Sequence, residues 1–204
     1  MEKQIIISIS REYGSGGHEI GRKLAEKLGI PFYDRNLLDE IAKKSGSDVS
    51  DLVEYDEKPK HFFGSRTVRG YSNNPAENIA ELQFALLKSK AADDDSFVVI
   101  GRCSDEIFDS IPGVNVLKVF ISGDWDFKVR RVVEKRSMDE KLAEKTILRH
   151  DKNRIAYHDH FCEHRWGDAR SYDLSVNAAK LGIDGTVDML YDYVQRLRKN
   201  YSEK

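Results

Sequence analysis

Short apolar runs alternate with amphipathic segments along most of the chain. Residues 4–10, QIIISIS, are dominated by isoleucine, which is typical of a strand buried on both faces of a parallel sheet. Ile20, Leu24 and Leu28 then recur at intervals of four and predict one face of a helix. A glycine and a proline follow and end that helix.

The same pattern predicts the remaining elements. Strands are expected at residues 32–33, 97–100, 114–121 and 172–176, and helices at residues 76–90, 124–136 and 183–197. Asp34 is placed to cap a further helix that carries Leu37. Residues 137–140 match a capping box, so a helix is expected to begin there and to continue to about residue 166. Strands that alternate with helices imply right-handed crossovers and a parallel sheet with helices on both faces.

Composition narrows the class of protein. The 204 residues carry 33 Lys plus Arg against 35 Asp plus Glu, a net charge of −2, and the mean hydropathy is −0.58. No run approaches the roughly 20 apolar residues of a membrane span, and a general nucleic-acid binder would be more basic. Two cysteines, Cys103 and Cys162, are too few for a disulfide framework. We therefore expect a cytoplasmic α/β protein without a signal peptide, a membrane anchor or a nucleic-acid partner.

A glycine-rich turn, residues 14–17, lies between the first strand and the first helix. Backbone N–H groups of such a turn point at an anion, and glycine lets the backbone approach it closely. A tight strand–helix turn that binds no ligand would also be rich in glycine, so this alternative stays open. The turn also departs from the P-loop pattern, because Gly17 stands where the lysine belongs and His18 where the hydroxyl belongs. Arg11 is a candidate source of the missing charge, although a guanidinium is not an equivalent group.

Three groups of motifs give the chain a resemblance to a known family. The first is residues 10–17 (SREYGSGG), 21–25 (GRKLA) and 32–34 (FYD); the second is residues 97–102 (FVVIGR), 117–121 (LKVFI) and 130–131 (RR); the third is residues 150–154 (HDKNR), 172–174 (YDL) and Asn177. In this order and at these separations the chain resembles the cytidylate kinase-like family, a divergent branch of the P-loop nucleoside monophosphate kinases.

The resemblance implies a fold and an activity. The fold would be a P-loop NTPase-type three-layer α/β/α domain over residues 1–204, with a five-stranded parallel sheet, a helical lid and an acceptor-binding insertion. The core would be residues 1–44, 76–136 and 171–204, the insertion residues 45–75 and the lid residues 137–170. The activity would be transfer of the γ-phosphoryl group of ATP, with Mg²⁺, to CMP, dCMP or a related phosphorylated acceptor.

Phosphoryl transfer requires positioning and positive charge around phosphate oxygens, which arginine supplies bidentately. The candidate catalytic residues are Asp34, Arg102, Arg131, Arg149 and Arg154. The candidate nucleotide-binding residues are Arg11, Gly14, Ser15, Gly16, Gly17, His18 and, near the adenine, Asn177. The candidate acceptor-binding residues are Asp34, Arg66, Arg69 and Arg102. A salt-bridged surface helix would also account for the lid arginines, because residues 124–170 hold twelve basic and ten acidic side chains.

Mg²⁺ is expected because it bridges nucleotide phosphates and needs few protein ligands. The sequence itself contains no evident Mg²⁺ ligand. His158, His160, Cys162 and His164 suggest zinc, but on one helix the four cannot converge on a tetrahedral ion. His160 and His164 alone could supply two ligands, with others from elsewhere. A polar lid helix with ordinary surface histidines also accounts for the run, and no metal site is assigned. Cys103 fits a small buried thiol. Two alternatives to a nucleotide kinase stay open: a non-catalytic nucleotide sensor, and a kinase for a non-nucleotide metabolite. The oligomeric state is not readable from the sequence.

Overall fold

A computed structural model describes residues 3–34, 37, 67–68, 71–72, 75–101 and 103–202. Five parallel strands form the main sheet of this part of the chain, in the order β2-β5-β1-β6-β7. Their bounds are Phe32–Tyr33 (β2), Phe97–Ile100 (β5), Ile6–Arg11 (β1), Val116–Ser122 (β6) and Leu174–Asn177 (β7). All five strands that the apolar runs predict are present, and the α/β class with a five-stranded parallel sheet is confirmed.

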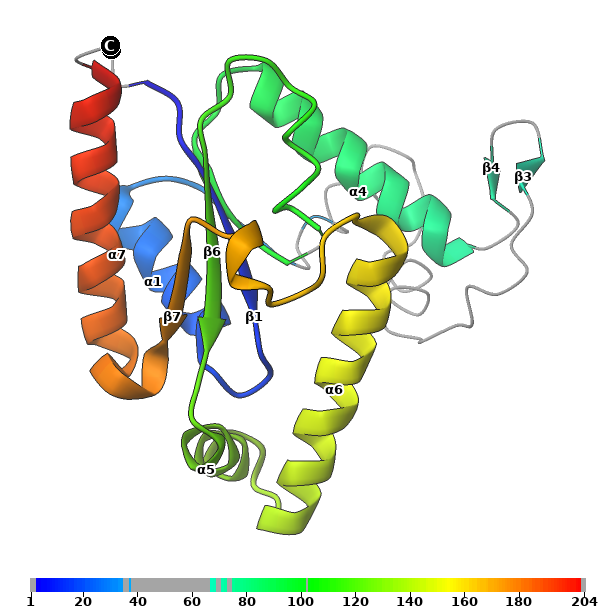
Figure 1. Ribbon diagram of the computed structural model, residues 1–204, viewed down its shortest axis with the longest axis vertical. Helices are drawn as coiled ribbons and strands as arrows, with labels where there is room; N and C mark the ends of the chain where they lie inside the picture. Colours follow the sequence, from blue (N-terminus) through cyan, green and yellow to red (C-terminus); the bar gives the residue numbers. More distant parts are fainter. Residues whose placement is uncertain are drawn as a thin grey trace.

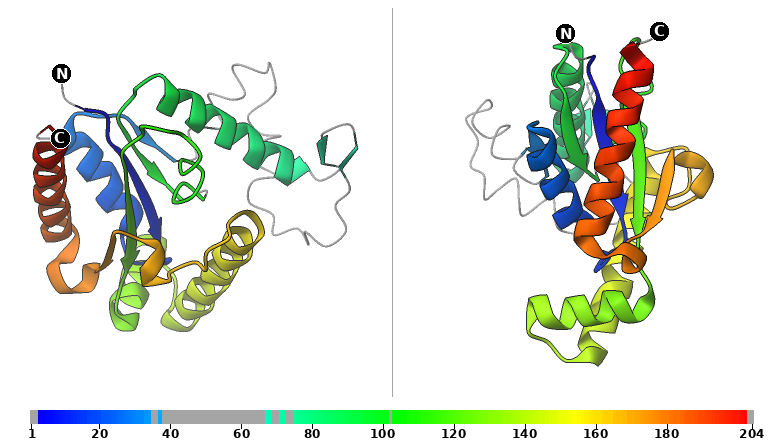
Figure 2. Two further views of the ribbon diagram at one scale, coloured as in Figure 1. Left: turned by 45° about the horizontal axis from the view of Figure 1, so that its top comes forward. Right: turned by 90° about the vertical axis from the view of Figure 1, so that its left-hand side faces the viewer.

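Helices cover both faces of this sheet, which gives three layers (Figure 1 and Figure 2). Helices α1 (Gly17–Leu28) and α7 (Ala178–Ser202) pack side by side on one face. Helix α4 (Pro75–Ala92) lies against the other face. A two-stranded antiparallel pair, β3 (Thr67–Val68) and β4 (Tyr71–Ser72), precedes α4. No helix within the described ranges is long and apolar enough to cross a membrane.

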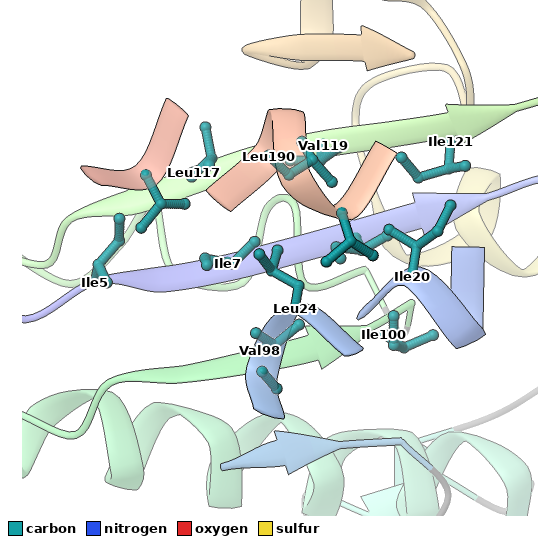
Figure 3. Packing of buried hydrophobic residues seen from close by; sticks show 14 of the residues in the cluster. Ile5, Ile7, Ile20, Leu24, Val98, Ile100, Leu117, Val119, Ile121 and Leu190 are labelled. Carbon is teal, nitrogen blue, oxygen red and sulfur yellow. The ribbon is translucent and has the colours of Figure 1, made fainter. Parts of the chain in front are cut away.

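The isoleucine-rich first strand explains why the sheet is covered on both sides. Ile5, Ile7 and Ile9 are fully buried against α1 and α7, where Leu24 and Leu190 pack onto them (Figure 3). The intervening Ile6 is equally buried but belongs to the cluster beneath α4. Successive side chains of a strand point to opposite faces, so a run of isoleucines has to bury both.

Two helices, α5 (Trp125–Arg136) and α6 (Glu140–Phe161), extend beyond the sheet toward the foot of the molecule in Figure 1. The predicted capping box at residues 137–140 is wrong. Ser137 takes a left-handed conformation (φ 51°) that ends α5, and the side chain of Asp139 caps α6 by accepting from the Leu142 N–H at 2.9 Å. The helix also ends at Phe161 and does not continue to residue 166. A three-residue 3₁₀ helix, Ala169–Ser171, leads from there into β7.

Candidate active site

The glycine-rich turn joins the carboxyl end of β1 to the amino end of α1, as the sequence predicted. Gly14 and Gly16 have φ of 82° and 87°, a left-handed backbone that glycine adopts without a steric penalty. Gly16 is the N-cap of α1 and supplies no side chain to the first helical N–H groups. The Ser15 hydroxyl accepts from the Gly17 N–H at 3.4 Å. A helix amino end next to a glycine turn is suited to an anion.

The missing lysine of the turn has a packing cause. A Cβ atom on Gly17 would lie 2.6 Å from Cβ of Arg11 and 3.3 Å from Cβ of Ile121, both closer than an ordinary contact. A Cβ atom on Gly16 would collide with the side chain of Ile183. The turn is therefore packed around the absence of side chains at these two positions. A lysine in place of Gly17 would require β1 or the turn to move.

Arg11 occupies the neighbouring space. Its stem lies beside Gly17, and its guanidinium lies against Gly101 at the carboxyl end of β5, so the side chain crosses from one strand end to the next. This edge of a parallel α/β sheet is where ligands bind. The position fits the predicted role of Arg11 as a source of positive charge for the turn.

His18 and Asp34 form a close pair at the same edge. His18 Nε2 lies 2.6 Å from Asp34 Oδ2, and the imidazole packs edge-on against Phe32 at 5.4 Å between ring centroids. Sequence reasoning selected both residues separately. It did not foresee that the histidine in the hydroxyl position would contact the aspartate after β2.

A cavity of about 970 Å³ lies between these strand ends and α6. Four arginines contribute to its wall, together with the His18–Asp34 pair: Arg11, Arg136, Arg149 and Arg154. Asp34 is the one acidic side chain among the described residues that line it. Arg136 was not selected from the sequence, although it belongs to the arginine-rich stretch on which the prediction of a lid depends.

A small set of polar contacts holds α6 against the segment after β1. The Tyr13 N–H donates to Asp151 Oδ1 at 2.7 Å, and the Tyr13 ring stacks on His150 at 4.3 Å. Arg154 Nη1 donates to the backbone oxygen of Arg11 at 3.0 Å and lies 3.6 Å from Asp151. Burial raises the pKa of Asp151. We call Tyr13, His150, Asp151 and Arg154 the α6 latch.

Other predicted site residues lie apart from the cavity lining. Arg131 of α5 donates to Glu19 of α1 at 3.0 Å. The pKa of Glu19 is lowered to about 2, chiefly by its hydrogen bond from Lys135 and, against the effect of burial, also by that from Arg131. Asn177 donates to Asp124 Oδ1 at 2.7 Å and accepts from the Ala179 N–H. Arg66, Arg69 and Arg102 lie outside the described residues, so their roles stay predictions.

Comparisons with known proteins agree with this architecture. A model of the cytidylate kinase-like family matches residues 6–180. An uncharacterized protein from Eubacterium ventriosum ATCC 27560 is 38% identical, with a TM-score of 0.73 over 94% of this chain and 99% of that one. More distant structures share the fold. A shikimate kinase from Bacteroides thetaiotaomicron is 16% identical with a TM-score of 0.51, and a gluconokinase from Sinorhizobium meliloti 1021 is 17% identical with a TM-score of 0.53. The aligned regions cover 94% and 98% of this chain and 98% and 96% of those chains, respectively. No protein of curated function matches the sequence.

Proposed function

Since the chain belongs to the cytidylate kinase-like family, we propose that it is an ATP-dependent phosphotransferase, with CMP or dCMP as the first acceptor to be tested. One observation carries the proposal. His18 in the first turn of α1, four arginines and the Asp34 carboxylate all line one cavity at the carboxyl edge of the sheet, and the glycine turn directly precedes His18. That is the set of groups that binding and transferring a phosphoryl group requires.

The backbone N–H groups of the turn and the arginines of the cavity would bind different parts of the phosphate groups. The turn at residues 14–17 would hold the donor phosphates through backbone N–H groups. Arg11 would stand in for the lysine, because its guanidinium crosses from the turn to the end of β5. Arg149 and Arg154, both on α6, would neutralise the transferring group from the opposite wall of the cavity.

Asp34 is suited to the acceptor side of the cavity. Its carboxylate would orient the acceptor, directly or through the imidazole of His18 at 2.6 Å. An oxygen ligand in a phosphate site also fits Mg²⁺, which takes one or two carboxylates and otherwise phosphate oxygens and water. Bound there, the ion would screen the negative charge of the donor phosphates.

The test is product formation from a panel of nucleoside monophosphates with Mg-ATP, measured as ADP release and confirmed by chromatography. We expect turnover of CMP or dCMP and a loss of roughly 100-fold or more in kcat/KM for Arg149→Ala and Arg154→Ala. Arg196→Ala is the matched control, because Arg196 is an exposed arginine on α7 and does not line the cavity. Absence of product with every nucleotide acceptor at millimolar concentration would overturn the assignment to nucleotides.

The packed turn at Gly17 favours one alternative, a protein that binds nucleotide without transferring a phosphoryl group. It predicts that Mg-ATP raises the melting temperature while no ADP forms. A third outcome, ADP release only with phosphorylated or hydroxylated small metabolites, would keep the chemistry and change the acceptor. Thermal shift and ADP release with one ligand panel separate the three.

A further inference from the structure

Four side chains with metal-binding chemistry meet beneath the cavity, from two segments far apart in the sequence. Cys103 and Asp105 lie in the turn that follows β5. His158 lies in the last turn of α6, and Cys162 is its C-cap. Ligand atoms of Asp105, His158 and Cys162 all lie within 4.8 Å of one another. Cys103 lies outside this 4.8 Å set, but its thiol neighbours that of Cys162 and belongs to the same turn as Asp105.

The cluster is buried and held in place from both sides. Cys103, Asp105 and His158 are 3%, 4% and 3% exposed. His158 Nε2 lies 2.9 Å from Asp105 Oδ2, while Asp105 Oδ1 has no hydrogen-bond partner among the described atoms. The backbone also fixes the turn, because the Glu106 and Ile107 N–H groups both donate to the Cys103 carbonyl.

The ligand types suit a cation. The cluster supplies two thiols, one imidazole and one carboxylate, and metal binding would release the thiol protons because the thiolate is the metal ligand.

We propose that Cys103, Asp105, His158 and Cys162 form a structural site for a thiophilic divalent cation of the zinc class. Two sulfurs, one imidazole and one carboxylate make a closed tetrahedral set, in which zinc bonds of about 2.0–2.3 Å place the ligands roughly 3.3–3.8 Å apart. Three of the ligand atoms already lie within 4.8 Å of one another, and the Cys103 side chain would move toward them to complete the set. Hard ions such as Mg²⁺ and Ca²⁺ prefer oxygen ligands and would bind poorly to two sulfurs.

The proposed site uses two residues of the histidine-rich run in the sequence, His158 and Cys162. His158 and Cys162 do share one side of the helix end, but their partners come from the turn after β5. His160 instead faces Glu77 of α4, with Nε2 3.4 Å from Oε1, and His164 is exposed. A bound cation would fasten the carboxyl end of α6 to the core directly under the cavity, which Cys103 and His158 line.

The test uses the reduced full-length protein, stripped with a chelator and then given Zn²⁺ or Co²⁺. We expect one Zn²⁺ per chain after desalting, measured by elemental analysis. We also expect a Co²⁺ spectrum with intense tetrahedral d–d bands and a sulfur-to-cobalt charge-transfer band. Cys162→Ser should weaken Zn²⁺ binding by more than about 100-fold in a chelator competition, since loss of a second-sphere partner alone costs 10–100-fold. Cys103→Ser should remove part of the charge-transfer band.

His164→Asn is the matched control, because it removes a nearby exposed histidine and should leave binding unchanged. Melting curves of the metal-free variants test that each one folds. Unchanged Zn²⁺ affinity in Cys162→Ser, an octahedral cobalt spectrum, or equal weakening in His164→Asn would overturn the proposal. So would a protein that takes up no Zn²⁺ but forms a Cys103–Cys162 disulfide on oxidation.

Discussion

The two walls of the cavity are held in place by different kinds of contact, one by apolar packing and the other by polar contacts. The wall made by the ends of β1 and α1 is fixed by hydrocarbon packing, with Ile9 and Ile20 fully buried and no space for a side chain at the adjacent Gly17. The opposite wall, α6, buries few apolar residues and leaves Leu148 at 62% and Ile155 at 42% exposure. Polar contacts attach it to the turn. Close-packed apolar contacts cannot be displaced gradually, whereas a few polar contacts can exchange with water or ligand.

This difference suits a phosphotransferase. The wall that would position the donor phosphates is rigid, and the wall that carries Arg149 and Arg154 is attached at separate points. Closure over a nucleotide would therefore come from α6 and not from the turn.

Gly17→Ala should destabilise the protein by about 1–3 kcal/mol, because the added Cβ would lie 2.6 Å from Cβ of Arg11, the half-buried last residue of β1. Gly17→Lys should cost at least as much and should not increase ADP release. Urea denaturation measures both. Gly29→Ala is the control for backbone conformation alone, since Gly29 has φ 67° but open space around it, and should cost about 1 kcal/mol. Wild-type stability of Gly17→Lys would contradict a rigid turn.

The sequence predicted the closely packed wall of the cavity better than it predicted α6. The strands and α1 were predictable because buried isoleucines and helical periodicity are local signals, and the sheet carries them without interruption. The start of α6 was misassigned because Ser137 and Asp139 are both good caps. Only the left-handed conformation of Ser137 decides between them.

The sequence predicted which kinds of residue form the candidate site, but not which of them contact one another. The candidate residues Arg11, His18 and Asp34 and the arginines of α6 were visible in the sequence, and the cavity brings them together. Residues 14–17 do not line it. The contact of His18 with Asp34, the latch on Tyr13 and the meeting of Cys103 with Cys162 depend on how distant segments cross. No local pattern records such contacts.

Asp151→Ala should loosen α6 while leaving β1 intact. The substitution removes the acceptor of the Tyr13 N–H and the carboxylate beside Arg154, a loss of about 1–2 kcal/mol. Hydrogen exchange should show roughly ten-fold faster exchange of α6 amides, with β1 amides unchanged. Asp159→Ala, at a half-exposed aspartate of the same helix, should have no such effect. Equal loss of protection in β1 would mean that the two walls unfold as one unit.

Glu19→Gln should cost about 1 kcal/mol or less at pH 7, and less still at pH 3. Glu19 joins α1 to α5 through Arg131 and Lys135, and its pKa falls from 4.5 to about 2 in the folded protein. A lowered carboxylate pKa stabilises the fold above the unfolded value and loses that contribution as the pH falls from about 4.5 toward 2. Urea midpoints of both proteins at pH 7 and pH 3 measure the difference. Glu26→Gln, on the same helix but 74% exposed, is the control and should show little change at either pH. An equal loss for Glu19→Gln at both pH values would mean that packing, and not charge, joins α5 to the rigid wall.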